Sequence, residues 1–294
     1  MAKRISQLAE ITTVDSNDLL NIVDVSDTTY SASGTNKRVT KANLLKEYDI
    51  FSGWISAEET WTYVSTDDPT GVIKINANVT SKYSEGMRLK MTNGGNTIYA
   101  IITKMGTYGG DEAGYTYITF LHEIDPTDSK ALHLMANSAI TSSYYSTQKA
   151  PQGFPMSPDK WSVETTSSSV LSQNPATKDV WYNKLSIILP IGSWSLMYKI
   201  TLEAYAEGAT QVMGRSTLST ADNSESDSQL TASVGLTSVW IGVSVGREKF
   251  LSLSSKTTYY LNILNTGSGS PSLRVITING AYSPSVIRAT CAYL

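Results

Sequence analysis

The chain has 294 residues, with 23 Lys and Arg against 26 Asp and Glu, a formal net charge of -3 and a single cysteine, Cys291. This length supports about two domains that each bury a core, and one cysteine excludes an intrachain disulfide scaffold. The near balance of charges leaves no strongly basic surface for a phosphate backbone, so we expect no nucleic-acid partner.

Hydroxyl and aromatic residues dominate the composition, with 40 Ser, 34 Thr and 17 Tyr, while only 17% of residues are charged. Such side chains favour pleated, half-buried surfaces over helices, so the composition predicts an all-β fold. No apolar run approaches the roughly 18 residues of a membrane span, and the N-terminus lacks the apolar stretch of a secretory signal. We therefore expect neither membrane insertion nor a signal peptide.

Residues 1–50 contain few apolar side chains, which come in short clusters separated by Asp, Ser, Thr and Asn. So little apolar surface cannot form a core of its own, which predicts that this segment needs a partner. The stretch Lys41 to Tyr48 follows Thr40 and spaces Leu and Tyr side chains at i and i+4. This spacing predicts one short N-capped helix in an otherwise extended segment.

Residues 51–160 alternate short strand-like stretches with turn residues. Strands are expected near residues 60–65, 71–75, 87–92, 97–104 and 115–121. Turns are expected at 67–71, 93–96 and 109–111, because Gly and Asn tolerate the positive φ of tight hairpins. This rhythm predicts a small β-barrel or β-sandwich, whereas residues 126–160 show little periodicity.

The remainder of the chain divides at a Ser- and Thr-rich stretch, residues 161–177, which lacks an apolar pattern and is expected to be a linker. Alternation returns at residues 196–204, 239–245, 259–263 and 273–278. Strands recurring every roughly 8 to 12 residues are typical of a β-sandwich. Residues 178–294 are therefore expected to form a jelly-roll-like C-terminal head.

No pattern for catalysis or metal binding stands out. The two histidines, His122 and His133, lie outside any metal-ligand spacing, and His122 is better interpreted as a polar residue at a strand end. The acids of Glu58-Glu59 and Asp67-Asp68 are adjacent in sequence, so on a strand each pair points to opposite faces instead of flanking a glycosidic bond. We expect no enzymatic activity, no metal and no cofactor.

Two polar loops of the C-terminal region are candidates for contact. Residues 222–228 alternate acids with small polar residues but lack the Gly and the terminal Glu of a calcium loop. Residues 267–271 are a Gly- and Ser-rich hairpin loop. Solvated loop tips are the ordinary interpretation, and contact with a polar receptor is the functional one. The candidate receptor-contact residues are Asp222, Asn223, Ser224, Glu225, Asp227, Ser268 and Ser270.

The N-terminal strings resemble a known kind of anchor. Arg4-Ile5-Ser6-Gln7-Leu8, Asp18-Leu19-Leu20-Asn21-Ile22-Val23-Asp24, Thr35-Asn36-Lys37-Arg38-Val39-Thr40 and Leu44-Leu45 are similar to the short anchoring segment that begins many tailed-bacteriophage fibre and minor virion proteins. The resemblance implies that residues 1–50 dock onto a baseplate, portal, neck or capsid protein. The anchoring residues that it implies are Ile5, Leu8, Asp18, Leu19, Leu20, Ile22 and Val23.

A second block extends this resemblance to about residue 155. The strings Gly53-Trp54-Ile55, Val79-Thr80-Ser81-Lys82-Tyr83-Ser84-Glu85-Gly86-Met87-Arg88-Leu89-Lys90 and Pro151-Gln152-Gly153-Phe154-Pro155 look like a small β domain of phage tail-fibre and other virion structural proteins. Residues 178–294 match no family by their motifs, although their strand rhythm is similar to trimeric jelly-roll heads on fibre tips.

Taken together, the resemblance implies a homotrimeric bacteriophage fibre or spike, made in the host cytoplasm and resident in the virion. Residues 1–50 would attach it, 51–160 would form a stalk domain, and 178–294 would contact a glycan or protein on the host surface. A head, collar or neck protein with a purely structural role would share the same motifs. A polysaccharide depolymerase is a second alternative, and it would need acids paired across the fold or between subunits.

Overall fold

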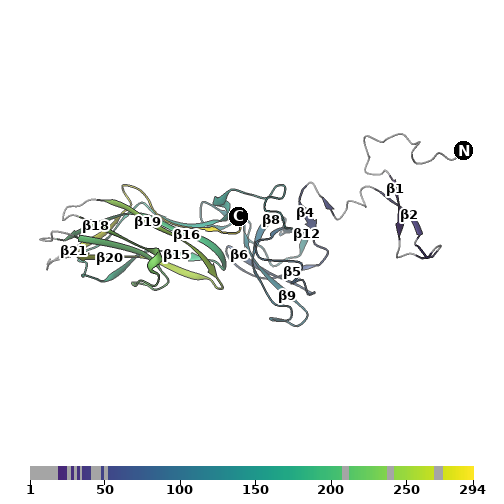
Figure 1. Ribbon diagram of the computed structural model, residues 1–294, viewed down its shortest axis with the longest axis horizontal. Coiled ribbons are helices and arrows are strands. Elements are labelled where there is room, and N and C mark those ends of the chain that lie inside the picture. The colour runs from purple at the N-terminus through teal and green to yellow at the C-terminus, as the bar shows by residue number, and fades with distance from the viewer. Residues whose placement is uncertain are drawn as a thin grey trace.

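The computed structural model describes residues 19–24, 28–29, 32–33, 35–40, 48–49, 52–206, 212–236, 242–267 and 274–294. Within these residues the regular elements are strands and two short 3-10 turns, which confirms the all-β prediction. Figure 1 shows two β units along the long axis of the molecule, with the C-terminus between them. No helix in the described ranges has the length and apolar character needed to cross a membrane.

The first unit is an eight-stranded antiparallel sheet of order β3-β4-β12-β7-β8-β9-β6-β5. Five of its strands, β5 to β9, are the five that the alternation predicts. The strands of this sheet are β3 (Tyr48–Asp49), β4 (Trp54–Ser56), β5 (Trp61–Asp67), β6 (Thr70–Ile75), β7 (Arg88–Asn93), β8 (Asn96–Met105), β9 (Thr116–His122) and β12 (Ile140–Ser146).

The tight turn between β7 and β8 shows why local sequence predicts this part of the sheet. Gly94 and Gly95 lie at φ 57° and 82°, between the paired residues Asn93 and Asn96. A two-residue hairpin of this kind needs positive φ at both central positions, which Gly adopts without steric cost. Adjacent strands joined by such a turn find their register from the turn itself.

Strand β12 lies in the region that showed little periodicity, yet it pairs with both β4 and β7 inside the sheet. Its register shifts between Thr141 and Tyr144, and Ser142 lies at φ 49°. A bulge of this kind inserts unpaired residues and breaks the two-residue alternation of side chains. The alternation on which a strand prediction depends is therefore absent from this sequence.

The second unit is a β-sandwich that begins at β13. One sheet has the order β13-β22-β16-β21-β14, with β19 on the other edge of β16, and the facing sheet has the order β15-β20-β17-β18. The strands are β13 (Ser162–Ser167), β14 (Val170–Gln173), β15 (Trp181–Leu189), β16 (Gly192–Ala206), β17 (Val212–Ser219), β18 (Thr231–Leu236), β19 (Val243–Leu253), β20 (Thr257–Gly267), β21 (Arg274–Asn279) and β22 (Ser285–Cys291).

The predicted linker 161–177 is wrong. Trp161 is fully buried, β13 pairs with β22, and β14 pairs with β21, so this stretch supplies two strands of the larger sheet. Ser and Thr dominate there because both strands lie at sheet edges and bury few side chains, among them Val163. A partly exposed edge strand needs no continuous apolar face, so its composition resembles that of a linker.

The long strand β16 organises the sandwich core. It pairs with β22 along its first half, with β21 along its second half, and with β19 on its other edge. Every second side chain of β16 points into the sandwich and is fully buried, as the predicted alternation requires. These inward residues are Trp194, Leu196, Tyr198, Ile200, Leu202 and Ala204.

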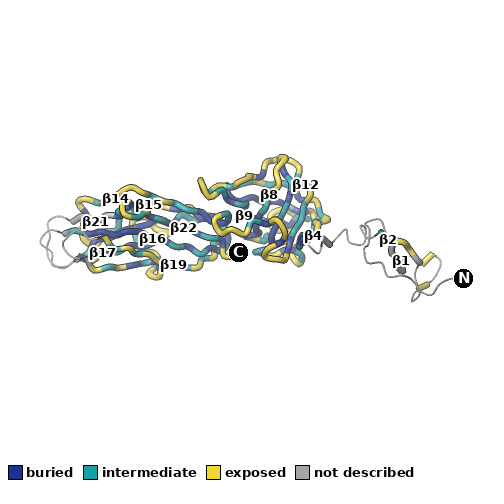
Figure 2. Tube along the Cα trace, turned by 90° about the horizontal axis from the view of Figure 1, so that it is seen from above, coloured by how far each residue is buried: buried dark blue, intermediate teal, exposed yellow. Residues whose placement is uncertain are grey.

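The two faces of the eight-stranded sheet contact two apolar cores. One core lies inside the first unit, and the other is shared with the sandwich. Ile102 and Phe120 face the first unit's own core. Ile101 and Leu121, their neighbours along β8 and β9, belong to the same apolar cluster as the interior of the sandwich. Figure 2 shows buried segments inside both units and exposed residues on their outer loops.

An aromatic stack seals this junction. The Phe154 and Trp161 rings lie parallel with centroids 5.0 Å apart, and Trp54 packs on Phe154 at 6.3 Å. The indole N–H groups of Trp54 and Trp161 donate to the carbonyls of Gln152 and Pro155, so the buried rings leave no unpaired donor. The stack ties residues 52–155 to the sandwich.

The N-terminal segment is described mainly as one hairpin. Strand β1 (Leu19–Asp24) pairs with β2 (Thr35–Thr40), and among the described strands neither pairs with any other. The expected helix at 41–48 lies largely outside the described residues, but its last residue is a correction: Tyr48 begins β3 and pairs with Ile55 of β4. The sheet of the first unit therefore begins at Tyr48, before the expected boundary at 51.

Candidate functional site

The predicted N-terminal anchor is only partly within the described residues. Leu19, Leu20, Ile22 and Val23 lie on β1, and Ile5, Leu8 and Asp18 lie outside the described ranges. A two-stranded hairpin alone is marginally stable in water, so β1 and β2 need contact with another surface to gain stability. The anchoring roles of these residues remain a prediction from the resemblance.

The predicted contact loop 222–228 lies within loop 220–228, which leads from β17 to the 3-10 turn η3 (Ser228–Leu230) and folds back over the four-stranded sheet. The fully buried Asn262 of β20 donates through Nδ2 to the carbonyls of Ala221 at 3.0 Å and Ser224 at 2.7 Å. The backbone N–H of Asn183 donates to Asn223 Oδ1 at 2.7 Å. These bonds fix the loop backbone to the outer face of the sheet.

Glu225, a candidate contact residue, already has partners inside the chain. Its Oε2 lies 3.0 Å from Arg215 Nη2, and its Oε1 accepts from the Thr231 hydroxyl at 2.7 Å. The guanidinium of Arg215 in turn lies over the Trp181 ring at 5.3 Å. Both carboxylate oxygens of Glu225 therefore bind side chains of the sandwich, Arg215 and Thr231.

Asp227 is held in the same way. Its carboxylate pairs with Lys249 of β19 and also accepts from the backbone N–H of Gln229, capping η3. The hydrogen bond from Lys249 holds the pKa of Asp227 below its ordinary value. Of the loop's acids, only Asp222 is exposed.

The strand ends that precede the two predicted contact loops lie far apart. Loop 220–228 follows Ser219, which pairs with Tyr260, whereas Ser268 and Ser270 follow Gly267, which pairs with Val212. These points are at opposite ends of the β17–β20 pair, a separation of roughly 23 Å for seven residues of strand. Ser268 and Ser270 lie outside the described residues. The loop 220–228 thus lies on the flank of the sandwich.

His122 is a neutral core residue at the end of β9. Its Nδ1 lies 2.9 Å from the Pro69 carbonyl, and its Nε2 lies 3.3 Å from the backbone N of Met135. Since the carbonyl only accepts and the N–H only donates, Nδ1 carries the proton. Burial lowers the pKa of His122 to about 4. No group of three or more His, Cys, Asp or Glu able to hold a metal occurs in the part of the chain that the structure describes.

Contrary to the sequence prediction, the acids considered for glycosidase chemistry do not lie in pairs along a strand: Glu58 and Glu59 lie between β4 and β5, and Asp68 follows β5. Glu59 contacts Lys82 Nζ at 2.8 Å, and Asp67 contacts Lys256 Nζ at 2.5 Å. Asp68 accepts from the backbone N–H of Ala131 at 2.8 Å. Glu59, Asp67 and Asp68 therefore each have a structural partner, and the absence of enzymatic activity remains a prediction.

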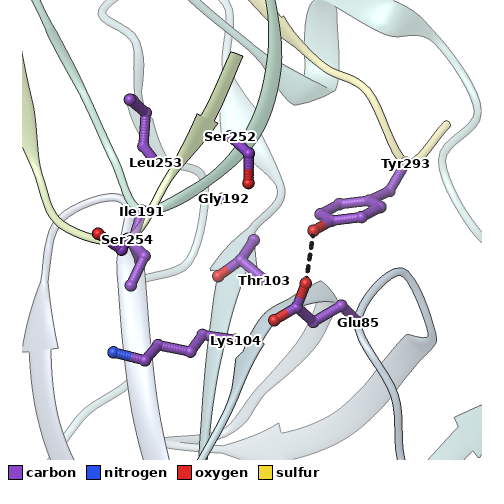
Figure 3. Close-up of a pocket in the computed structure, with 9 residues that line it drawn as sticks. All are labelled: Glu85, Thr103, Lys104, Ile191, Gly192, Ser252, Leu253, Ser254 and Tyr293. Carbon is purple, nitrogen blue, oxygen red and sulfur yellow. Dashed lines mark hydrogen bonds between the residues drawn. The ribbon is translucent and has the colours of Figure 1, made fainter.

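Sequence reasoning missed a groove at the junction of the two units. It is lined by Glu85 and Thr103 from the first unit and by Gly192 and Tyr293 from the sandwich, and its volume is about 200 Å³ (Figure 3). Glu85 and Tyr293 are 208 residues apart in sequence and are joined by a hydrogen bond of 3.0 Å. Glu85 lies in one of the strings that resemble a phage β domain, but nothing in the local sequence marks either residue as a ligand contact.

Comparison with known proteins gives only distant likenesses. No protein-family model and no curated protein sequence matches the chain. Among solved structures, the T=1 particles derived from infectious bursal virus are 12% identical, with a TM-score of 0.27, covering 84% of this chain and 78% of that one. The VP2 subviral particle of infectious bursal disease virus is 12% identical, with a TM-score of 0.28, covering 85% and 82%.

Proposed function

We propose that this chain is a structural protein of a bacteriophage virion, a fibre or spike anchored through residues 1–50. The observation that carries the proposal is the contrast between the two parts of the chain. Residues 52–294 are built around a core that spans both β units, whereas β1 and β2 pair only with each other among the described strands. A stiff body with an attachment segment that needs a partner fits a particle-bound appendage.

The sequence supports the same proposal independently. The strings around Ile5, Leu19-Leu20 and Val39 resemble phage anchoring segments, and residues 53–155 resemble a small β domain of phage virion proteins. The partner of the anchor would be a baseplate, portal, neck or capsid protein. Its apolar surface would cover the hairpin and contribute the burial that six-residue strands lack.

The proposal extends to assembly and host contact. Phage fibres of the kind that the sequence resembles are homotrimers, and threefold presentation multiplies weak contacts with a host glycan or protein into useful avidity. The sandwich would form the host-facing part, because it lies on the side of the first unit away from β4, which follows the anchoring segment in the chain (Figure 1).

The test is incorporation of the protein into particles. A variant lacking residues 1–47 keeps the whole eight-stranded sheet, which begins at Tyr48. We expect it to stay folded by circular dichroism and to be missing from purified particles, while a matched Asp222→Asn variant is incorporated normally. Incorporation of the truncated protein at wild-type level would refute the anchor.

Particles that lack the protein also separate the two structural alternatives. If such particles adsorb normally to host cells, the protein is a head, collar or neck component with a purely structural role. If they lose adsorption, the result supports a host-contacting fibre. Analytical ultracentrifugation of the full chain tests the trimer.

A further inference from the structure

The junction of the two units contains a groove with the lining of a ligand site. Its floor is formed by Thr103 of β8 and Gly192 at the start of β16, where the units approach closely. A Cβ on Gly192, which lies at φ 135°, would come within 3.1 Å of the Thr103 side chain. The groove therefore depends on glycine at this point and on the two units remaining docked.

A second hollow, about 390 Å³ in volume, lies on the other side of Glu85 and Tyr293 and is lined by Met87, Thr147 and Lys149 as well. The Tyr293 hydroxyl donates to Glu85 Oε2 at 3.0 Å and lies 3.1 Å from Ser193 Oγ. Glu85 and Tyr293 therefore line two compartments, the groove of about 200 Å³ and this hollow of about 390 Å³. The volume of the second falls within the range of about 300–1,000 Å³ that is typical of ligand pockets.

The walls of the first compartment differ in chemistry. In Figure 3 the Glu85 carboxylate and the Tyr293 ring lie on one side, with the Lys104 ammonium and the Ile191 and Leu253 side chains on the other. The hydroxyls of Ser252 and Ser254 also line the groove. One anion and one cation give no net charge, so the groove has no cationic cluster of the kind that binds phosphate groups.

These groups match the surface of a sugar ring. A carboxylate accepts from paired hydroxyls, a lysine ammonium and serine hydroxyls donate to ring and hydroxyl oxygens, and a tyrosine ring covers the apolar C–H face of a pyranose. We propose that the junction groove binds a short, uncharged saccharide, with Glu85 and Tyr293 as its principal contacts. The source is the host surface, and in this respect the inference rests on the proposed function.

The groove is held in its binding shape by the fold itself. The carbonyl of Tyr293 accepts from the buried Arg88 at 3.0 Å, and a Cβ added to Gly86, which lies at φ 87°, would come within 3.2 Å of the Tyr293 ring. The backbone of Tyr293 is therefore held by Arg88, and its ring packs closely on Gly86, before any ligand arrives. Preorganised contacts of this kind reduce the conformational entropy lost on binding.

The test uses the full-length protein and saturation-transfer NMR with glucose, galactose, N-acetylglucosamine, N-acetylgalactosamine and their disaccharides maltose, lactose and chitobiose. We expect at least one of these sugars to bind. Glu85→Gln should weaken that binding at least tenfold, because the oxygen that accepts from the sugar hydroxyls is replaced by an NH2 group, which only donates. The fold should be retained, since the amide oxygen still accepts from Tyr293.

Two further variants make the result specific. Tyr293→Phe should keep the ring and weaken binding less than Glu85→Gln. Asp179→Asn changes an exposed acid that lines neither hollow and should leave binding unchanged. Binding that persists in Glu85→Gln, binding lost in Asp179→Asn instead, or no binding of any tested sugar would each overturn the inference. Glu85→Gln leaves the sequence of residues 1–47 unchanged, so incorporation into particles is measured separately and fails or succeeds independently.

Discussion

Replacing Arg88 should loosen the junction between the two β units. The side chain is only 1% exposed, and its three nitrogen groups donate to the carbonyls of Lys149 at 3.1 Å, Gly86 at 2.5 Å and Tyr293 at 3.0 Å. Its guanidinium also lies over the Phe154 ring at 5.1 Å. Burial lowers the pKa of Arg88 below its ordinary value. One side chain therefore fastens a loop, a strand end and the C-terminal residues.

The Arg88→Met variant leaves three carbonyls without their donors. Each unsatisfied buried acceptor costs about 1–3 kcal/mol, and removal of a buried charge that lacks a carboxylate partner among the described residues offsets part of that cost. We expect a net loss of about 3–5 kcal/mol in the free energy of unfolding. Arg88→Lys should lose less, since an ammonium keeps the charge but cannot span all three acceptors.

Urea unfolding followed by tryptophan fluorescence measures this difference. The matched control is Arg288→Met, which breaks an exposed pair with Glu164 and should cost less than about 1 kcal/mol. Hydrogen exchange should also accelerate at Tyr293 in the Arg88 variant alone. Equal losses for Arg88→Met and Arg288→Met would refute the reasoning.

Two other perturbations follow from buried polar groups. The pKa of His122 is about 4 in the folded chain and about 6.5 in the unfolded chain. Between these pH values the unfolded chain binds a proton that the folded chain does not. The free energy of unfolding should therefore fall as the pH falls, by about 2 kcal/mol at pH 5. Thermal unfolding across this range checks it, and an unchanged slope in His122→Phe would contradict it. Asn262→Ala removes the two hydrogen bonds from Asn262 to loop 220–228, so hydrogen exchange at 221–227 should rise while β16 stays protected. An unaltered loop would show that the contacts of Asn223, Glu225 and Asp227 are enough to hold it.

The sequence predicts the strands of the first unit well where consecutive strands pair with each other. Strands β5 and β6, and β7 and β8, are joined by short turns whose Gly, Asn and Pro residues specify the reversal. Local turn chemistry and two-residue alternation suffice for such pairs. The same reasoning finds β16, whose inward side chains are uniformly apolar over eleven residues from Trp194 to Ala204.

Prediction fails where the decisive partner is far away in the chain. β13 is a strand because β22 lies beside it, more than a hundred residues later, and nothing in the Ser- and Thr-rich sequence carries that information. The flank position of loop 220–228 likewise depends on Asn262, and the junction groove depends on Glu85 meeting Tyr293. Register and long-range pairing arise from the packed fold, which a single sequence pattern does not encode.

The shared core determines how host contact must be studied. A fragment that begins near residue 161 would lack Trp54 and Phe154, and it would expose the Trp161 ring and the end of the sandwich that Ile101 and Leu121 cover in the whole protein. Large exposed apolar patches promote non-specific association, so binding by such a fragment would report on that surface as much as on any receptor site. The fragment would also lack Glu85 and Thr103, one half of the junction groove. Binding measured on the full chain avoids both effects, because there the first unit completes both the shared core and the groove.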